Sequence, residues 1–581
     1  MKQMLTATFL VAIVLLLIAP SQVFAQAGDT LVVYATPNSL DEIITRDTTS
    51  TGAQAHKVYK LVSLDTTYLY SGAITVKSDL TVIGVPHSST GRPPCIQPAV
   101  LPDNSIPGNL FVMNGPKTKG TFKNLYLLGL STNGSANNGG VAFQISADSI
   151  TLVVDNTVFE EWLTFAIGYN GNWDKFFITN CKFRNMVEPN QWYIGEVLRN
   201  EWPGAAYTDS VVMKYNTMFC INGYAACPVT KYYETYFEFS HNNVIYTFKN
   251  PFFIFNVTKG KINNNIFYGA WAGGIALAEY PWWDQLWSPE VGSIIDFDVL
   301  DSAKIALWQP GLPRLAAGVV DTAAEKLRTV EVKNNVYFWP KTLTDYWTAW
   351  NDTAHVDSVY TVSWMNTRTT NMFTDKTTWP GFTQSGNQNV DPGFGTSIPN
   401  VLTQSTDGLL DWFKLCRTGT LTTTYWGYQR TQVGTAANWV PPWPLPEAQH
   451  MQYTNTAVKN SSTDGLALGD PYWFKGSPTA VGSQPAPVPL EFTLSQNYPN
   501  PFNPSTTILF TLTSAEHVKL IVFNMLGQEV RTLVDQEMMT GRHNVTWDGR
   551  DNRGTQLSSG VYFYRLETKS LTVTRNMLLL K

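Results

Sequence analysis

The chain carries little charge for its length, and the charge that it has is not clustered. Asp, Glu, Lys and Arg make up 15% of its 581 residues, and the net charge is −5. Ordinary globular chains carry about 25% charged residues. Without a basic stretch or a block of like charge, nucleic acid is not an expected partner.

Cysteine is also scarce, with five residues and no C-x-x-C or similar metal spacing. Cys220 and Cys227 lie close enough in sequence to close a short loop, and disulfides are permitted outside the cytoplasm. A bridge between them is one prediction. The alternative is that both, like Cys95, Cys181 and Cys416, are buried small apolar side chains.

No apolar run is long enough to cross a membrane. The longest lies near the start of the chain, where Lys2 precedes an apolar stretch over residues 9–19 and a small-residue end at Val23-Phe-Ala25. A membrane span needs about 20 apolar residues, whereas this pattern is typical of a secretory signal peptide. We therefore predict that residues 1–25 are a signal peptide cleaved after Ala25, and that the mature protein is soluble.

One short phrase recurs through the middle of the chain: an Asn followed three positions later by an aromatic or aliphatic residue. The leading residues are Asn124, Asn156, Asn180, Asn216, Asn242, Asn264 and Asn334. Their spacing gives an irregular period in the twenties with insertions, which is typical of a solenoid.

The choice of Asn has a physical reason in a stack of β-coils. Asn tolerates the left-handed backbone conformation that a sharp corner requires. Coils stack about 4.8 Å apart, so equivalent Asn side chains can hydrogen-bond along the stack as a ladder. The apolar residue three positions on would then point into the core. The alternative is a β-sandwich with Asn-rich turns.

Three segments resemble the right-handed parallel β-helix family related to pectate lyases: Thr75-Val-Lys-Ser-Asp-Leu-Thr-Val-Ile-Gly84, Asn389-Val-Asp-Pro-Gly-Phe394 and residues 464–474. The resemblance implies an all-β chain. The expected domains are a parallel β-helix over 26–340 with an insertion at about 268–333, then irregular final coils or a cover over 341–475. A Pro-rich linker is expected over 476–490, since prolines there favour an extended spacer.

The last ninety or so residues carry a different set of motifs. They include Leu494-Ser-Gln-Asn-Tyr-Pro-Asn-Pro-Phe-Asn-Pro504, Asn524-Met-Leu-Gly-Gln-Glu-Val530 and Ser559-Gly-Val-Tyr-Phe-Tyr-Arg-Leu566. Apolar residues alternate with polar ones between Gly- and Pro-rich turns, which predicts a small antiparallel, immunoglobulin-like β-sandwich.

This segment, residues 491–581, resembles the type A C-terminal sorting domain of type IX secretion. The resemblance implies the type IX outer-membrane export machinery as a partner and a secreted or outer cell-surface location. In that family the sandwich is usually removed after export, which would place the cut near the 476–490 linker.

The β-helix resemblance raises the question of chemistry. Lyases of this kind need acidic groups to hold calcium and a Lys or Arg to take a proton. The candidates are Glu160, Glu161, Asp174, Glu188, Glu196, Glu201 and Asp209, with Arg184 and Arg199 as bases. Scattered charge on solvated strands is the simpler interpretation, and no nucleophile, zinc or phosphate-loop motif occurs. No cofactor is expected unless the chain is a lyase, which would use calcium.

A tryptophan cluster suggests sugar binding without catalysis. Trp282, Trp283 and Trp287 fall within six residues, and exposed aromatic patches often mark binding sites. Packing against the flank of the stack is the alternative. Two functions follow: a surface or matrix component that binds polysaccharide or surface glycan, or a polysaccharide lyase or other carbohydrate-active enzyme suggested by the fold alone.

A further pattern concerns modification. Asp followed by Ser or Thr and a small or apolar residue occurs at Asp29, Asp47, Asp65, Asp148, Asp209, Asp301, Asp321, Asp352 and Asp357. The pattern is similar to the O-glycosylation sequon of bacteria that use type IX export. A turn that begins a strand explains several of these positions equally well.

Overall fold

The computed structural model places two compact units, residues 1–475 and 476–581. We call them the β-helix unit and the sandwich unit and describe each by itself. The structure describes residues 24–25, 29–35, 39–51, 53–63, 66–137, 139–188, 194–200, 208–226, 236–254, 257–276, 293–300, 322–352, 359–403, 408–417, 443–445, 450–474, 493–494, 496–497, 500–512, 516–538, 541–568 and 572–580.

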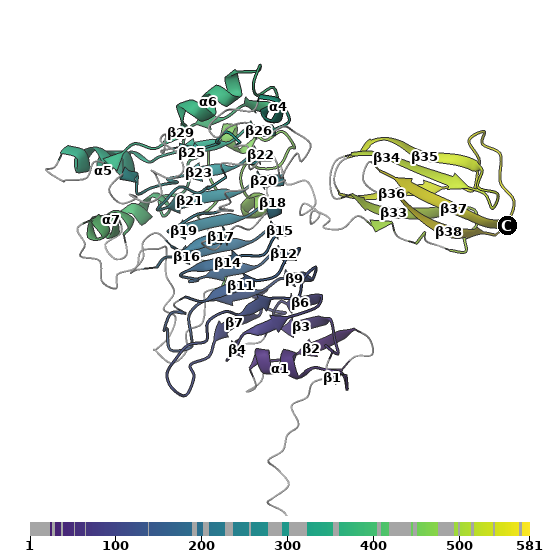
Figure 1. The fold of residues 1–581 in the computed structure, drawn as a ribbon, viewed down its shortest axis with the longest axis horizontal. Helices are drawn as coiled ribbons and strands as arrows, with labels where there is room; N and C mark the ends of the chain where they lie inside the picture. Colours follow the sequence, from purple (N-terminus) through teal and green to yellow (C-terminus); the bar gives the residue numbers. More distant parts are fainter. Residues whose placement is uncertain are drawn as a thin grey trace, which may run out of the picture. The chain divides into compact units, whose positions relative to one another are not determined.

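The β-helix unit is a stack of coils whose strands pair, almost all in parallel, with those of the next coil (Figure 1). Sheet 1 contains β1 (Phe24–Ala25), β2 (Thr30–Val33), β3 (Val58–Val62), β6 (Leu80–Val85), β9 (Lys119–Lys123), β12 (Thr151–Asp155), β15 (Asp174–Thr179), β18 (Thr208–Lys214), β20 (Tyr236–Ser240), β22 (Lys259–Asn263), β26 (Thr329–Lys333) and β30 (Phe382–Ser385). Its first pair, β1 with β2, is antiparallel.

Two further sheets complete the coils. Sheet 2 contains β4 (Tyr68–Tyr70), β7 (Cys95–Pro98), β10 (Tyr126–Leu128), β13 (Val158–Glu160), β16 (Lys182–Met186), β19 (Thr217–Ile221), β21 (Asn243–Thr247), β23 (Ile266–Tyr268), β27 (Val336–Phe338) and β31 (Gln388–Asn389). Sheet 3 contains β5 (Ile74–Val76), β8 (Phe111–Met113), β11 (Val141–Ile145), β14 (Phe165–Tyr169) and β17 (Glu196–Asn200).

Each coil runs from sheet 1 to sheet 2 and on to sheet 3 before it returns. In one coil β12 leads to β13 and β14, and β15 then pairs in parallel with β12. Aromatic side chains fill the interior: the rings of Phe111 and Phe143 stack 5.4 Å apart, and those of Phe159 and Phe183 stack 4.7 Å apart. The predicted fold class, a parallel β-helix followed by an antiparallel sandwich, is confirmed.

The corner between sheets 1 and 2 has the left-handed residue that the recurring phrase predicted. The φ angles are 47° at Asn156, 56° at Asn180 and 58° at Asn264. In two coils, however, the corner residue is Tyr215 (φ 60°) or His241 (φ 54°). The prediction that Asn216 and Asn242 occupy the corner is therefore wrong by one residue.

This one-residue shift of the corner changes which side chains fill the core, because successive strand residues point to opposite faces. Met218 and Val244, rather than the Phe219 and Ile245 of the phrase, stand in register with Phe183. Phe219 and Ile245 face outward but are also buried, since other segments cover that face of sheet 2.

The asparagine ladder exists at the position just after the corner. Its five rungs are Asn216, Asn242, Asn265, Asn335 and Asn387. Asn242 Oδ1, for example, accepts hydrogen bonds from Asn216 N at 2.9 Å and from Asn216 Nδ2 at 3.0 Å. Each Nδ2 also donates to a backbone carbonyl of sheet 1, as Asn265 Nδ2 does to Phe239 O at 2.8 Å. The ladder thus links the corners of successive coils through both the Oδ1 and the Nδ2 atoms of the side-chain amides.

Among the described residues, sheet 3 ends at β17, and β25 (Ser293–Ile295) and β29 (Ser363–Met365) form a separate parallel pair in the later coils. The other elements of the unit are α1 (Leu40–Arg46), α4 (Thr322–Glu325), α5 (Lys341–Asp352), α6 (Thr367–Thr374), η2 (Pro399–Leu402), α7 (Leu409–Arg417), α8 (Thr456–Lys459), η4 (Pro471–Phe474), β24 (Ile275–Ala276) and β28 (Val359–Tyr360). Trp347 of α5 donates to Ala272 O at 2.9 Å, and Phe413 of α7 packs 4.8 Å from Phe248.

The sandwich unit has two antiparallel sheets and its own core (Figure 1). One sheet contains β32 (Thr493–Leu494), β33 (Thr506–Leu512) and β36 (Gly541–Trp547). The other contains β35 (Glu529–Met538), β34 (Glu516–Phe523), β37 (Gly560–Glu567) and β38 (Thr572–Leu579). Alternate residues such as Phe510 and Leu520 are fully buried beside Trp547 and Tyr564. The alternation read from the sequence therefore marks the inner faces correctly.

Candidate functional site

Most of the acidic and basic candidates in the β-helix unit are buried. Those with less than a tenth of their surface exposed are Glu160, Glu161, Asp174, Arg184, Glu188, Glu196 and Arg199. The interpretation of these residues as charge on solvated strands is wrong, because segments distant in sequence cover the strands that carry them. Glu201 lies outside the described residues. Asp209 is half-buried, 3.9 Å from the ammonium of Lys175.

The first buried cluster centres on Glu160 at the end of β13. Arg184 of the next coil donates to Glu160 Oε1, and the hydroxyl of Tyr126 in the preceding coil donates to Oε2. Asn185 Nδ2 also lies 3.3 Å from Oε1. The strands β10, β13 and β16 are adjacent in sheet 2, where Glu160 is paired with Arg184, and Tyr126 is paired with Val158, two residues before Glu160. Both oxygens of the carboxylate are thus occupied.

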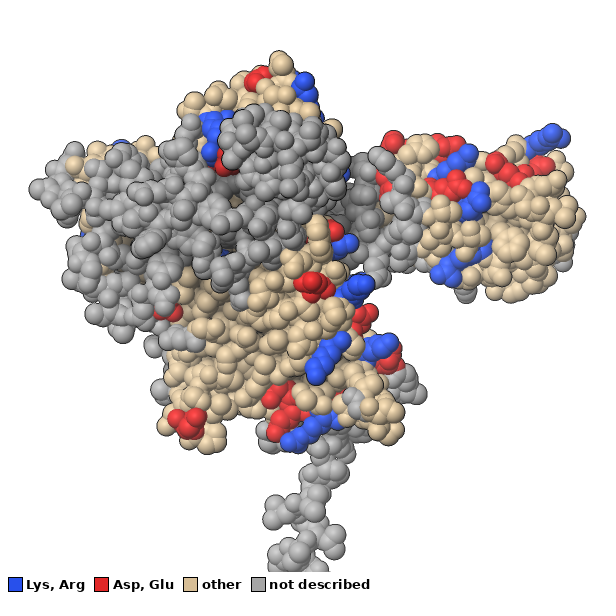
Figure 2. All heavy atoms as spheres, viewed as in Figure 1, with Lys and Arg blue, Asp and Glu red and all other residues tan. Residues whose placement is uncertain are grey.

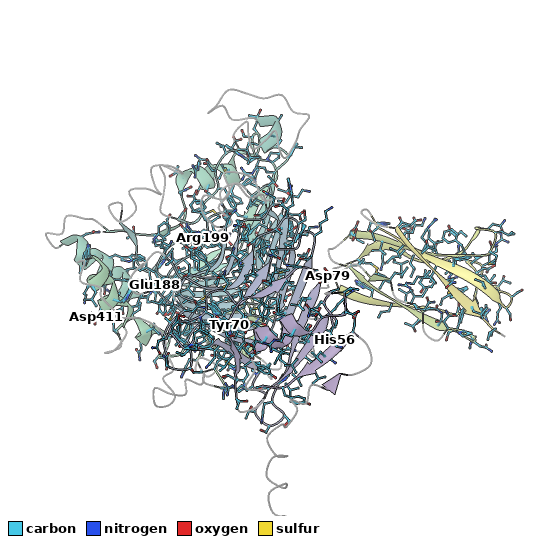
Figure 3. The ribbon with its side chains drawn as sticks, turned by 60° about the horizontal axis from the view of Figure 1, so that its bottom comes forward. His56, Tyr70, Asp79, Glu188, Arg199 and Asp411 are labelled. Carbon is cyan, nitrogen blue, oxygen red and sulfur yellow. The ribbon has the colours of Figure 1, made fainter. Side chains whose placement is uncertain are left out.

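The second cluster centres on Glu196 at the start of β17, and Figure 3 shows Glu188 and Arg199 among the packed side chains of the unit. Arg199 Nη1 lies 2.8 Å from each oxygen of Glu196. Lys249 adds a hydrogen bond of 3.2 Å to Oε1, and its ammonium sits 4.3 Å from the centre of the Tyr224 ring. Lys249 was not among the candidates, because nothing in its local sequence marks it.

Asp174 differs from these two carboxylates, because it forms no ion pair with any of the residues that the structure describes. Its Oδ1 accepts the backbone N–H of Ile150 at 2.8 Å, whereas Oδ2 has no hydrogen-bond partner. Burial, opposed by that hydrogen bond and reinforced by the charge of Asp148, raises the pKa of Asp174 to about 8. At neutral pH the carboxyl is therefore mostly protonated.

A cover formed by residues 450–474 lies over the outward face of sheet 2. Asp470 Oδ2 accepts hydrogen bonds from Lys182 Nζ at 2.7 Å and from the Thr217 hydroxyl at 2.8 Å. Trp473 donates its indole N–H to the same hydroxyl at 2.8 Å. The Lys182 ammonium also lies 4.5 Å from the centre of the Tyr472 ring. This buried contact fixes the cover to the middle coils.

These arrangements leave the candidate acids poorly suited to proton transfer or metal binding. The carboxylates of Glu160 and Glu196 are already held by cations, and a general base needs access to its substrate. In the part of the chain that the structure describes, no three His, Cys, Asp or Glu side chains gather in a way that could hold a metal ion. The calcium expected of a lyase therefore finds no such cluster there.

Three predicted sites are left untested. Trp282, Trp283 and Trp287 lie outside the described residues, as does Cys227. Cys220 is buried, and its bridge to Cys227 stays a prediction. Cleavage after Ala25 also stays a prediction, although residues 24–25 are placed as strand β1.

At least two of the nine Asp–Ser/Thr pairs lie where a strand begins, Asp29-Thr30 at β2 and Asp148-Ser149 just before β12. Asp148 and Ser149 precede β12, and Asp148 Oδ1 accepts the backbone N–H of Asn172 at 2.9 Å. The turn alternative accounts for this position, and glycosylation stays a prediction.

The sandwich unit exposes two apolar side chains at one tight turn between β34 and β35. Met525 is 66% exposed and Leu526 is 81% exposed. Asn524 holds the turn: its Oδ1 accepts from Leu526 N at 2.9 Å and from Gln528 N at 3.0 Å. Gly527 supplies the left-handed residue, with φ 75°. The turn is therefore well ordered although its tip is apolar.

Comparison with known proteins bears mainly on the sandwich unit. The model of the FlgD Ig-like domain family matches residues 502–571. No curated protein matches the chain. Among solved structures, PorZ, described as an essential bacterial surface component of the type-IX secretion system of Porphyromonas gingivalis, matches at 20% identity with a TM-score of 0.12. The match covers 15% of this chain and 11% of PorZ.

The FlgD Ig-like match agrees with the antiparallel sandwich seen in the structure. The chain spans only about a tenth of the length of PorZ, and a likeness this limited supports no argument about function. Among the described residues, no helix is long and apolar enough to cross a membrane.

Proposed function

We propose that this is an exported β-helix protein whose C-terminal sandwich is recognised by the type IX outer-membrane machinery. The support is the separation of the chain into two units. Because the sandwich unit has its own core, the export machinery could recognise it independently of the β-helix unit. Its motifs at Leu494–Pro504 and Asn524–Val530 resemble those of sorting domains.

The observation that carries this proposal is the apolar turn at Met525 and Leu526. Exposed apolar side chains on a small domain are expected where a partner covers them. Asn524 and Gly527 fix the turn before any partner arrives, which lowers the conformational cost of binding. The type IX machinery would thus bind an apolar turn whose conformation is already set.

Replacing Met525 and Leu526 together by Ser tests this proposal in the native bacterium. We expect the double variant to fold, because both side chains are solvent-exposed, but to remain inside the cell. Immunoblots of the medium, the cell surface and the periplasm measure the distribution. Val561→Ser, which removes an exposed apolar side chain of the same unit, is the control and should be exported normally. Normal export of the double variant would contradict the proposal.

For the β-helix unit, the proposed role is binding of glycan without catalysis, at the cell surface or in the surrounding matrix. The support is the pairing of Glu160 with Arg184 and of Glu196 with Arg199 and Lys249. These pairs occupy the groups that lyase chemistry would need. Release of unsaturated sugars from uronate polymers in the presence of calcium, measured by ultraviolet absorbance, would instead favour the lyase.

A further inference from the structure

The corners between sheets 3 and 1 repeat in three successive coils. Lys117, Ser149 and Trp173 occupy the same place, with φ angles of 62°, 61° and 62°. The backbone N–H of Lys117 donates to Asp148 O at 3.0 Å, and that of Ser149 donates to Asn172 O at 2.7 Å. The three corners are thus joined directly, one coil above the next.

Two columns of side chains line these corners. Asn114, Ser146 and Asn170 form the first column, and all three are exposed; the backbone N–H of Ser146 and that of Asn170 each bond to the strand end of the preceding coil. Lys117, Ser149 and Trp173 form the second column. Neighbouring members of a column are about 4.8 Å apart, as in any parallel sheet. We call these six residues the corner ledge.

Trp173 is the unusual member of the ledge. It is 41% exposed, more than any other Trp that the structure describes. Tryptophan is highly buried on average. A left-handed conformation also costs roughly 1–2 kcal/mol for a residue other than Gly. The turn itself does not require an indole, since Ser149 makes the same turn one coil earlier.

Charges of both signs lie near the corner ledge. Asp148 is held by Asn172, which donates both its backbone N–H, at 2.9 Å, and its Nδ2, at 3.1 Å, to Asp148 Oδ1. Lys175 lies 3.9 Å from Asp209. Lys119, two residues beyond Lys117, donates its backbone N–H to Asp79 Oδ1 at 2.8 Å. Figure 2 shows an uncharged area on the part of the β-helix unit that is not grey, with Lys, Arg, Asp and Glu along the side on which the strands of sheet 1 lie in Figure 1 and at the base.

We propose that the corner ledge binds a neutral glycan chain, with one pyranose ring stacked on Trp173. The indole offers a rigid apolar face with one polar edge. The Asn and Ser side chains offer donors and acceptors for the sugar hydroxyls. Their repeat along the stack suits a chain of similar units. This inference rests on the proposed glycan-binding function and gives it a location.

Affinity electrophoresis of the full-length protein tests the ledge. The gels contain hydroxyethylcellulose, laminarin or xyloglucan as neutral polysaccharides, or alginate as an acidic one. We expect at least one neutral polymer to retard the wild-type protein. Trp173→Gly should weaken this binding at least tenfold, and Trp173→Phe, which keeps a ring, should weaken it less. Tyr34→Ala, which removes another exposed aromatic side chain, should leave it unchanged.

The Gly variant separates binding from folding, because Gly adopts the left-handed conformation at no cost. Its melting temperature should stay close to that of the wild type, because relief of the left-handed strain opposes the greater freedom of Gly in the unfolded chain, and Trp173→Asn provides a second variant suited to the same φ. Unchanged retardation of both variants would overturn the ledge while leaving glycan binding intact. Retardation of the wild type by alginate alone would contradict the proposal that the ligand is a neutral glycan. No retardation by any polymer would overturn both the ledge and the proposed function.

Discussion

The early and late coils of the β-helix satisfy their buried polar groups in different ways. At the position after the corner, the early coils carry Leu125, Thr157 and Cys181, whereas the late coils carry the five-rung asparagine ladder that begins at Asn216. The early coils bury charge pairs such as Glu160 with Arg184, and the late coils combine the ladder with charge pairs of their own, such as Glu325 with Arg328. The two halves therefore share buried charge pairs and differ in the neutral amides.

The difference teaches which buried groups depend on a single partner. A buried amide in the ladder keeps some hydrogen bonds when a neighbour is lost, because each rung also bonds to a backbone carbonyl. A buried charge without its counter-ion has no comparable substitute. We therefore expect a buried charge pair to be more sensitive than the ladder to substitution of one polar residue.

The largest effect is expected from Arg184→Met. It leaves Glu160 buried without its cation, which should lower the free energy of unfolding by about 3–5 kcal/mol. Urea unfolding followed by tryptophan fluorescence measures the change. The double variant Glu160→Leu with Arg184→Met removes both charges and should recover most of the loss. If the single variant were as stable as the wild type, the comparison between a buried charge pair and the ladder would fail.

A smaller loss is expected from Asn265→Leu in the middle of the ladder. It removes the acceptor of Asn242 N and Nδ2 and the donor to Phe239 O. Because these groups are buried, we expect a loss of about 2–3 kcal/mol. Asn387→Leu, at the half-buried last rung, should cost about half as much by the same measurement. Equal losses at the two positions would show that the ladder does not act rung by rung.

The smallest change is expected from Asp174→Asn, and it is a gain. The folded state holds a proton up to about pH 8, whereas the unfolded chain releases it near pH 4. The wild type therefore loses stability from this group as the pH rises from 4 to 8. The variant should gain nothing at pH 4 and about 1–2 kcal/mol at pH 9, after the cost of burying the new amide. A gain that does not depend on pH would contradict this reading of Asp174.

The sequence predicts the stack well because Asn and an apolar residue recur at a fixed offset. It fails by one residue at Asn216 and Asn242, since Asn suits both the corner and the ladder and the two positions are adjacent. Tyr215 and His241 at the corner could not be anticipated, because residues other than Gly, Asn and Asp are uncommon there.

The site is less predictable than the fold. The burial of Glu160 and Glu196 depends on neighbouring coils and on covering segments, which no local pattern reveals. Trp173 was not predicted as a binding residue, because a single Trp forms no pattern in the sequence, whereas a cluster does. The parallel between Asp148-Ser149 and Asn172-Trp173, 24 residues apart, is the signal that would have placed an indole on a corner.

The contact between Lys182 and Asp470 spans 288 residues of chain. Ribosomes make proteins from the amino end, so the middle coils exist long before their counter-ion does. Until residue 470 emerges, Lys182 must stay hydrated and the outer face of sheet 2 must stay open. The cover formed by residues 450–474 can therefore bind to sheet 2 only late in synthesis, shortly before the sandwich unit is made. The β-helix unit thus completes its folding in the order in which its segments are made.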